Sequence, residues 1–393
     1  MELPKFLKSI DPEDTRDLLG KLIRSKSLNP PGDVRECAAV IVEELKRRKL
    51  PAETIEEKPG VANVVSGLDG QADGKTLIWN GHFDVVPPGE DWQSDPFSGE
   101  YREGYIYGRG ASDMKSGLAA MIIALDALKK AGAPFRGRIV LQAVGDEETG
   151  SDGGTLVMIR RKIGAGADFA IVSEPTNLNV SIGNRGLRWF EVSVKGRASH
   201  AGRPYLGANA IHATARMIGR VENLRFKAHH SLFEIPHPSL SVTMIQGGTK
   251  INIIPDRCTF AIDRRMIPGE TSESALQEIE EALRQNLSEG IAYDIRITHE
   301  GWDPYAINPD LPPVRSLCRA IEEVVGQPPQ VKGKAGCTDA SHLFHRAHIP
   351  VVCFGPGLED LSHAANERVS LEKVVQAAQV YALSAMTLLE GKS

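Results

Sequence analysis

Several features that would assign this chain of 393 residues to a specialised class are missing. No apolar run approaches the roughly 18 residues of a membrane span, because the best candidate, 118–128, is interrupted by Asp126. Residues 1–9 lack the apolar stretch of a secretory signal peptide. The five cysteines are widely spaced without a C-x-x-C pair, so neither a disulfide framework nor a zinc finger is expected. We therefore predict a cytoplasmic protein with no membrane partner.

A clustered basic face, which is typical of nucleic-acid binders, is also missing. The net charge is −5 at pH 7. The densest basic run, 46–49, falls at the expected C-terminal end of a helix, where positive charge complements the helix dipole. No nucleic-acid partner is expected.

Two common enzyme motifs are absent or incomplete. The chain has no G-x-S-x-G elbow, which disfavours a serine hydrolase of that type. Gly108-Arg109-Gly110 begins like a dinucleotide loop, but Ser112 and Asp113 stand where the fingerprint requires further glycine. A dehydrogenase is therefore disfavoured.

The composition is that of a globular protein, with 41% hydrophobic and 25% charged residues. The length favours about two domains. Helical periodicity alternates with short apolar runs of β-branched character in the first half, which predicts an α/β fold with a mainly parallel sheet. The helices are expected at 12–27, 34–49 and 115–131, and the strands at 75–82, 137–145 and 168–173.

The pattern changes after about residue 184. The order becomes β-α-β-β-α-β, the ferredoxin-like arrangement, with strands at 188–196, 239–246, 252–265 and 292–299 and helices at 207–222 and 271–287. A helix, a strand and a helix at 310–325, 349–354 and 370–389 then resume the first pattern. We predict a catalytic domain of residues 1–184 plus 299–393, with an α+β domain inserted at 185–298.

Polar side chains suited to metal binding recur where strands end or helices begin. Alone, each is compatible with a helix cap, an acidic loop or a structural histidine. Together, two histidines and three carboxylates suit two divalent ions that share a bridging carboxylate, with zinc as the first choice and cobalt or manganese as alternatives. These residues are His82, Asp113, Glu148, Glu174 and His363.

Two further carboxylates accompany this set. Asp84 lies two residues after His82, on the same side of a strand, where it can orient the imidazole. Glu147 precedes Glu148 directly, so the two side chains should point different ways. One can bind metal while the other moves protons.

Five motifs, in order along the chain, resemble those of the dinuclear zinc aminoacylase/carboxypeptidase family. This family includes acetylornithine deacetylase and succinyl-diaminopimelate desuccinylase. The motifs are Gly-His-Phe-Asp-Val-Val-Pro, Gly-Arg-Gly-Ala-Ser-Asp-Met-Lys-Ser-Gly, Asp-Glu-Glu-Thr-Gly-Ser, Ser-Glu-Pro-Thr and Ser-His-Ala-Ala-Asn-Glu.

The resemblance implies a role for each residue. Asp113 bridges two metal ions, His82 and Glu174 complete one site, and Glu148 and His363 complete the other. Further implied roles are Asp84 as the support of His82, Glu147 as the general base, and a cis peptide bond after Asp113.

The resemblance also implies that the inserted domain is a lid and dimerisation module. His200 matches a histidine that reaches into the partner's active site in dimeric members, so a homodimer through the lid is expected. Asn252 and Arg265 match lid residues that contact substrate, and Gly355 matches a loop that lines the cleft. The segment Gly336–His342 lacks the arginine of the desuccinylase branch and is closer to the acetylornithine deacetylase style.

The leading functional hypothesis is hydrolysis of the amide bond of N-acyl amino acids. The alternative is a dipeptidase, tripeptidase or carboxypeptidase that uses the same two metal ions on a short peptide. A binding protein without catalytic activity is disfavoured, because the ligand set and Glu147 are both intact.

Overall fold

The computed structural model of the chain describes residues 3–389, apart from the side chain of Glu300. The chain divides into two compact units. Unit 1 comprises residues up to Gly183, Ile307–Lys332 and the chain from Thr338 onward, and unit 2 comprises Asn184–Ala306 and Gly333–Cys337. The short strands β15 (Tyr305–Ala306) and β16 (Val331–Lys334) lie where the chain passes between the units.

A mixed sheet with a parallel centre forms the middle of unit 1. Its order is β1-β2-β6-β3-β7-β17-β8, in which β6, β3, β7 and β17 run parallel and the outer pairs are antiparallel. The strands are β1 (Glu53–Glu56), β2 (Ala62–Asp69), β3 (Thr76–His82), β6 (Arg138–Val144), β7 (Phe169–Val172), β8 (Val180–Asn184) and β17 (Val351–Cys353).

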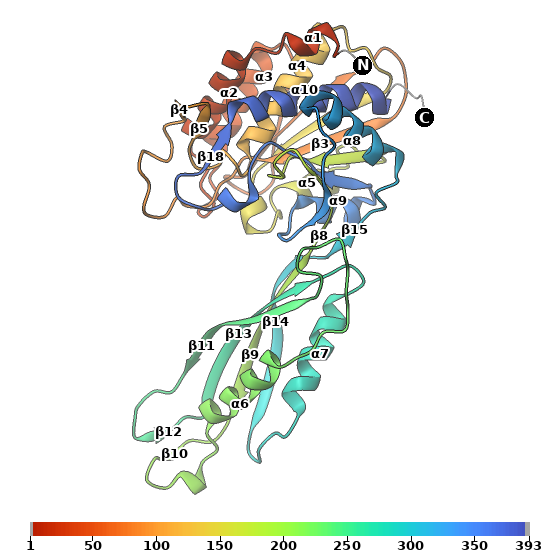
Figure 1. Cartoon of the computed structure of the whole chain (residues 1–393). Helices are drawn as coiled ribbons and strands as arrows, with labels where there is room; N and C mark the ends of the chain where they lie inside the picture. Colours follow the sequence, from red (N-terminus) through yellow and green to blue (C-terminus); the bar gives the residue numbers. More distant parts are fainter. Residues whose placement is uncertain (1–2, 390–393) are drawn as a thin grey trace. The chain divides into compact units, whose positions relative to one another are not determined.

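Helices cover this sheet. In Figure 1, α4 and α10 lie on one side of it and α5 and α9 on the other. The helices are α1 (Lys5–Lys8), α2 (Pro12–Arg24), α3 (Arg35–Arg47), α4 (Lys115–Lys130), α5 (Thr155–Arg160), α8 (Pro312–Val325), α9 (Asp339–Ala347) and α10 (Leu371–Leu389). A small antiparallel sheet, β18-β5-β4, joins Arg368–Ser370 to Tyr105–Tyr107 and Glu100–Arg102.

Local sequence signals explain several of these element ends. Asp11 caps α2 by accepting from the Glu13 N–H, and Pro12 occupies the first helical position. Gly326 ends α8 in the left-handed conformation. Helix α4 is buried almost throughout, as its nearly continuous apolar sequence requires. Among the described residues, no helix combines the length and apolar character needed to cross a membrane.

Unit 2 carries a separate four-stranded antiparallel sheet of order β11-β13-β9-β14. In chain order these are strands 2-3-1-4, the ferredoxin-like arrangement expected from the sequence. The apolar alternation of β9 and β13 faces α6 and α7 across one core. The elements are β9 (Gly186–Lys195), β10 (Ser199–His200), α6 (Ala210–Glu222), β11 (Ser239–Gly247), β12 (Ile253–Ile254), β13 (Arg257–Met266), α7 (Ser272–Arg284) and β14 (Ala292–Trp302).

The predicted fold class, a mainly parallel α/β layer with an inserted antiparallel α+β part, is confirmed. The single strand expected at 252–265 is wrong. The chain instead forms β12, which pairs with β10, and then β13 after a break at Pro255 and Asp256. Proline lacks the N–H that a continuous ladder requires.

Candidate metal centre

The ends of two neighbouring parallel strands bring the first ligand group together. His82 is the last residue of β3, and Glu174 follows β7, which pairs with β3. Asp113 lies just before α4. The Nε2 atom of His82 is 3.3 Å from Asp113 Oδ1 and 3.8 Å from Glu174 Oε1. These three residues form one group able to hold an ion.

A second group shares Asp113 with the first. Glu148 lies in the short 3-10 helix Glu147–Thr149 that follows β6, and His363 lies in the loop before β18. The Nε2 atom of His363 is 3.1 Å from Glu148 Oε2 and 3.7 Å from Asp113 Oδ2. Asp113 therefore turns one oxygen toward each histidine. The peptide bond after it is cis, as the resemblance implied.

The donor set fits two divalent ions. Nitrogen and oxygen ligands about 2.1 Å from one zinc ion at tetrahedral angles lie about 3.4 Å from each other. The four distances above, from 3.1 to 3.8 Å, lie around this value. The His82 Nδ1 atom is 3.0 Å from the main-chain oxygen of Asp84, which can only accept. Nδ1 therefore carries a proton, and Nε2 is the nitrogen available to a metal ion.

The electrostatics agree with this fit. Burial raises the pKa of Glu148, and the nearby negative charge of Asp113 adds to the effect, although a hydrogen bond from His363 opposes it. The pKa of His82 is raised well above its ordinary value, because contacts with Asp113 and Asp84 outweigh the opposing effect of burial. The negative charges of Asp113 and Glu148 thus repel each other, and divalent cations would offset this repulsion.

Glu147 lies beside the ligand groups without belonging to either. Its Oε2 atom is 3.9 Å from His82 Nε2. Burial raises the pKa of Glu147 well above its ordinary value, and the charges of Glu174 and Glu148 raise it further, against the opposing effect of His82. A carboxyl with a raised pKa is better suited to accept a proton than an ordinary carboxyl.

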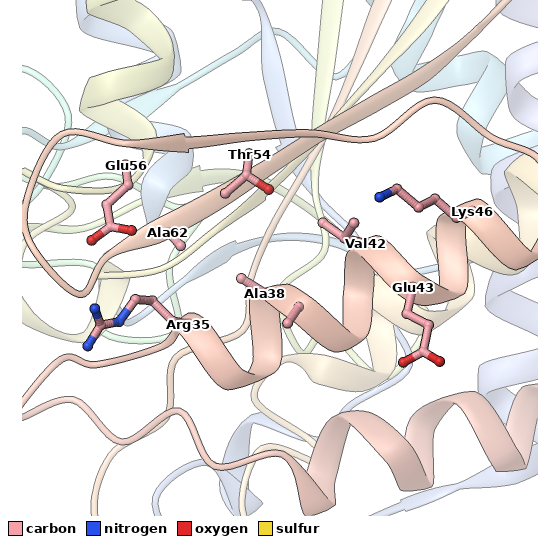
Figure 2. A pocket seen from close by; sticks show the side chains of 9 residues that line it. Arg35, Ala38, Val42, Glu43, Lys46, Thr54, Glu56 and Ala62 are labelled. Carbon is pink, nitrogen blue, oxygen red and sulfur yellow. The ribbon is translucent and has the colours of Figure 1, made fainter.

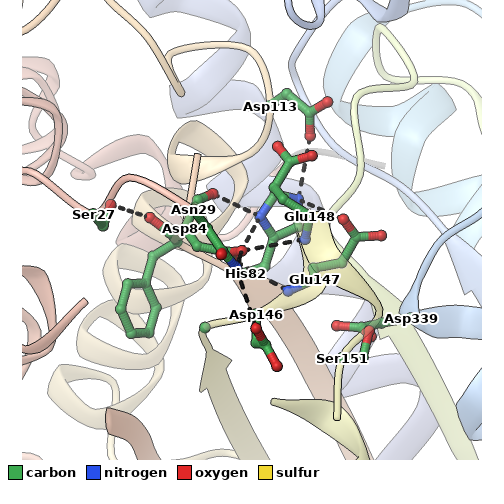
Figure 3. A network of polar contacts seen from close by, with 12 residues as sticks. Ser27, Asn29, His82, Asp84, Asp113, Asp146, Glu147, Glu148, Ser151 and Asp339 are labelled. Carbon is green, nitrogen blue, oxygen red and sulfur yellow. Dashed lines mark hydrogen bonds and ion pairs between the residues drawn. The ribbon is translucent and has the colours of Figure 1, made fainter. Parts of the chain in front are cut away.

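Asp84 ties the strand that carries His82 to the loop that carries Glu147 and Glu148. It is fully buried and accepts from the backbone N–H groups of both glutamates at 3.2 Å. Asn29 donates to Asp84 at 2.9 Å and to Asp146 at 3.2 Å (Figure 3). Burial alone would raise the pKa of Asp84, but hydrogen bonds from His82, Asn29 and the Glu148 N–H lower it. Asp84 thus stays ionised as an acceptor.

The remaining candidate in unit 1, Gly355, packs against the segment that carries Glu174. Its N–H donates to Thr176 Oγ1 at 3.1 Å. A Cβ atom at this position would lie 2.6 Å from the main-chain oxygens of both Ser173 and Glu174. Only glycine allows this approach.

Three candidates belong to unit 2. His200 on β10 lies near Asn252, because β10 pairs with β12 and the Ala201 N–H donates to the main-chain oxygen of Asn252 at 3.0 Å. His200 is exposed, and its Nδ1 accepts from the Gly202 N–H at 3.0 Å, so Nε2 is its free donor. Arg265 on β13 forms a two-point contact with Asp263 at 2.7 and 3.2 Å.

Three supporting residues, Asn29, Arg109 and Glu367, were not assigned a role from the sequence. Asn29, far from the motifs, gave no signal, while Arg109 and Glu367 stood inside quoted motifs without a function. Asp339, for which the sequence suggested a place near the pocket for the acyl group or the amino acid, lies at the start of α9. It accepts from Ser151 and Thr155, and burial raises its pKa to about 6. The sequence pointed to Arg109 and Glu367 only in that each lies within one of the five motifs.

An open groove of about 530 Å³ lies elsewhere in unit 1, between α3 and the strands β1 and β2. Figure 2 shows its lining of mixed charge, including Arg35, Lys46 and Glu56. None of its lining residues belongs to the ligand groups. The groove is therefore separate from the metal centre.

Comparisons with known proteins agree with this geometry. Residues 78–387 match the sequence profile of peptidase family M20/M25/M40. The chain is 32% identical over 368 residues to the succinyl-diaminopimelate desuccinylase of Wolinella succinogenes, covering 91% of this chain and 95% of that protein. It is also 32% identical over 351 residues to the N-formyl-4-amino-5-aminomethyl-2-methylpyrimidine deformylase of Bacillus subtilis, covering 81% of each.

The fold is that of a solved member of the family. The M20 family metallo-carboxypeptidase Sso-CP2 from Sulfolobus solfataricus superposes with a TM-score of 0.78 at 20% identity, covering 95% of this chain and 98% of that one. The same conclusion follows from the sequence profile, from the two relatives and from the two ligand groups. The chain belongs to peptidase family M20/M25/M40 and is a dinuclear metal-dependent hydrolase.

Proposed function

We propose that the chain hydrolyses the amide bond of N-acyl amino acids, in the style of acetylornithine deacetylase. The observation that carries the proposal is the pair of ligand groups sharing Asp113, with the carboxyl of Glu147 beside them. Two relatives at 32% identity are named for removing a succinyl and a formyl group, which supports an acyl–nitrogen bond as the target.

The proposed ligands are His82, Asp113 and Glu174 at one metal position and Asp113, Glu148 and His363 at the other. Zn²⁺ is the proposed metal, with Co²⁺ and Mn²⁺ as alternatives that accept the same nitrogen and oxygen donors. When bound, the two ions supply Lewis-acid activation of water and of the amide carbonyl.

Glu147 is the proposed general base. Its buried carboxylate takes a proton from the attacking water and later delivers it to the nitrogen of the leaving amine. The raised pKa of Glu147 supports the first step, because a more basic carboxylate takes up a proton more readily. Asp84 keeps the loop of Glu147 fixed through the two backbone hydrogen bonds.

Unit 2 is the proposed lid, corresponding to the inserted domain predicted at 185–298. His200 would donate through Nε2 to the developing oxyanion, and Arg265 would bind a carboxylate of the substrate through its planar fork. Asn252 and Gly355 are proposed to contact substrate as well. The contact between Arg265 and Asp263 supports this role by holding the guanidinium in one orientation.

A homodimer through unit 2 is part of the proposal. Strand β11 lies at the edge of its sheet, and its side chains Met244 and Ile245 are 71% and 58% exposed. An apolar edge strand of this kind favours pairing with another chain. A cytoplasmic location is also proposed, since none of the five cysteines, all of which the structure describes, is joined in a disulfide.

The acyl group is proposed to be small and uncharged. Gly336–His342 holds no arginine with which to neutralise a succinyl carboxylate. A dipeptidase, tripeptidase or carboxypeptidase activity is the second candidate, because the same metal chemistry would cleave a peptide bond.

The test is metal-dependent release of free amine from a substrate panel. The panel contains N-acetyl, N-formyl and N-succinyl amino acids beside dipeptides and tripeptides. We expect cleavage of N-acetyl amino acids that is abolished by a chelator and restored by Zn²⁺ or Co²⁺. Cleavage of peptides alone would replace the proposal with the peptidase function, and preferential cleavage of N-succinyl substrates would contradict the inference from Gly336–His342.

A further inference from the structure

Arg109 and Glu367 form a buried ion pair next to the metal centre. The Nη1 atom of Arg109 donates to Glu367 Oε2 at 2.6 Å, and neither side chain is more than 2% exposed. The two residues are 258 positions apart in the chain. Neither belongs to a ligand group or to the proton-transfer step proposed above.

Glu367 holds the backbone that leads to Asp113. Its carboxylate accepts from the N–H groups of Gly110, Ser112 and Asp113 at 3.0, 2.7 and 2.9 Å. Together with Arg109, four donors therefore converge on one carboxylate. A carboxylate that accepts from charged and backbone donors at once fixes the geometry of those donors strongly.

Arg109 holds the backbone around His363. It donates to the main-chain oxygens of His363 and Ala364 at 3.1 and 3.2 Å. It also donates to the oxygen of Pro88 at 3.2 Å, in the loop that follows β3 and His82. The Trp92 ring, 5.3 Å from the guanidinium carbon, packs against it.

The pair thus links the loop of the bridging ligand to the loop of the second histidine. Desolvating an arginine and a glutamate costs energy that their mutual attraction often fails to recover, so a buried pair is weak evidence for a role in stability alone. Here nearly every contact of the pair is with backbone of ligand-bearing loops.

We propose that Arg109 and Glu367 are positioning residues that set the placement of His363 relative to Asp113, and so set the affinity of the metal position these two share with Glu148. The proposal rests on the ligand set proposed above. Partners behind metal ligands typically contribute about 10- to 100-fold to metal affinity.

The experiment is a titration of the full-length, metal-stripped protein with Co²⁺. Binding is measured by calorimetry and by the visible absorption of bound Co²⁺. The variants are Arg109→Met and Glu367→Gln. Arg48→Met is the matched control, because Arg48 forms a similarly buried pair with Glu44 in unit 1, away from the ligand loops. His363→Ala tests the ligand set itself and should bind one ion.

We expect Arg109→Met and Glu367→Gln to raise the Kd for Co²⁺ at the position of Asp113, Glu148 and His363 about 10- to 100-fold and to change the absorption spectrum of the bound ion. Arg48→Met should leave both affinities within about threefold of wild type, the spread expected for a site the substitution does not touch. Arg109→Lys keeps the positive charge but lacks the planar guanidinium, so it should raise the Kd for Co²⁺ less than Arg109→Met does. This variant tests the proposal if Arg109→Met does not fold.

Unchanged affinities in the Arg109 and Glu367 variants would overturn the proposal. A loss of Co²⁺ affinity equal to that of Arg48→Met would also overturn it, because the pair would then act only through the general stability of the protein. If His363→Ala binds two ions like wild type, the ligand set is wrong, and this result is distinct from a failure of the positioning pair.

Discussion

Asp113 is the residue on which both ligand groups depend, because each of its oxygens faces a different histidine. The adjacent residues Glu147 and Glu148 have different proposed roles. Glu148 faces His363, while Glu147, the preceding residue, lies near His82. Adjacent positions in a tight turn give two identical side chains different surroundings, which allows one to bind metal and the other to carry a proton.

Gly355→Ala is expected to disturb the metal position of His82 and Glu174. The added methyl group would lie 2.6 Å from two main-chain oxygens beside Glu174, so the backbone must shift. We predict a destabilisation of about 1–3 kcal/mol, as for other overpacked sites, and loss of one of the two ions, measured by metal analysis after dialysis.

Gly219→Ala is the control for this substitution. Gly219 lies within α6, and apart from its neighbours in the chain and the backbone of the helix itself, no atom lies within 4 Å of the added Cβ. It should be neutral or stabilising by up to about 1 kcal/mol. Full metal retention and wild-type stability in Gly355→Ala would show that the close approach is not needed.

At the scale of elements, helices α2 and α3 are joined by a cluster of charged side chains. Glu44 on α3 is buried and accepts from Lys21 at 2.6 Å, from Arg47 at 3.0 Å and from Arg48. Burial alone would raise the pKa of Glu44, but these cations lower it from 4.5 to about 2. Such a shift corresponds to about 3 kcal/mol in favour of the folded state when the carboxyl is ionised.

Glu44→Gln should therefore destabilise the protein in a pH-dependent way. Because the folded pKa is depressed, the contribution is complete above about pH 4.5 and is lost as the pH falls toward 2. The measurement is urea unfolding of chelator-treated protein from pH 7 to pH 3. Glu36→Gln, on the exposed part of the same helix, is the control. If the free energies of unfolding of wild type and Glu44→Gln differ by the same amount at every pH in this range, the ionised Glu44 does not stabilise the folded state as proposed.

The elements also explain how far the sequence could predict the site. His82 ends a strongly apolar strand, and Glu148 and Glu174 each follow one. Parallel strands bring such ends to one edge of a sheet, so these candidate ligands could be predicted from the local pattern. The pairing of Arg109 with Glu367 depends on contact between distant segments, which no local pattern reports. The break at Pro255 was missed because the apolar residues on both sides read as one strand.

At the scale of the whole molecule, the chain divides into a unit that carries the ligands and a unit that carries His200, Asn252 and Arg265. A catalytic role is proposed for the first unit and the role of a lid for the second. The proposed dimer follows from unit 2, whose edge strand β11 exposes apolar side chains.

Ile245→Lys is expected to separate the proposed dimer, because lysine on an edge strand opposes pairing with another chain. Sedimentation velocity should give twice the mass of one chain for wild type and a single chain for the variant. The Co²⁺ stoichiometry of the variant should stay at two, since the ligands lie in unit 1. A wild-type protein that remains monomeric at high concentration would refute the proposed dimer.

The most direct test of the account is turnover and metal content of Glu147→Gln, measured on the same preparation with the substrate found in the panel. Glutamine keeps the shape of the side chain but cannot accept the proton. The account predicts that two ions per chain remain bound while kcat falls about 10²- to 10⁴-fold. Near-normal turnover with both ions bound would show that Glu147 is not the general base.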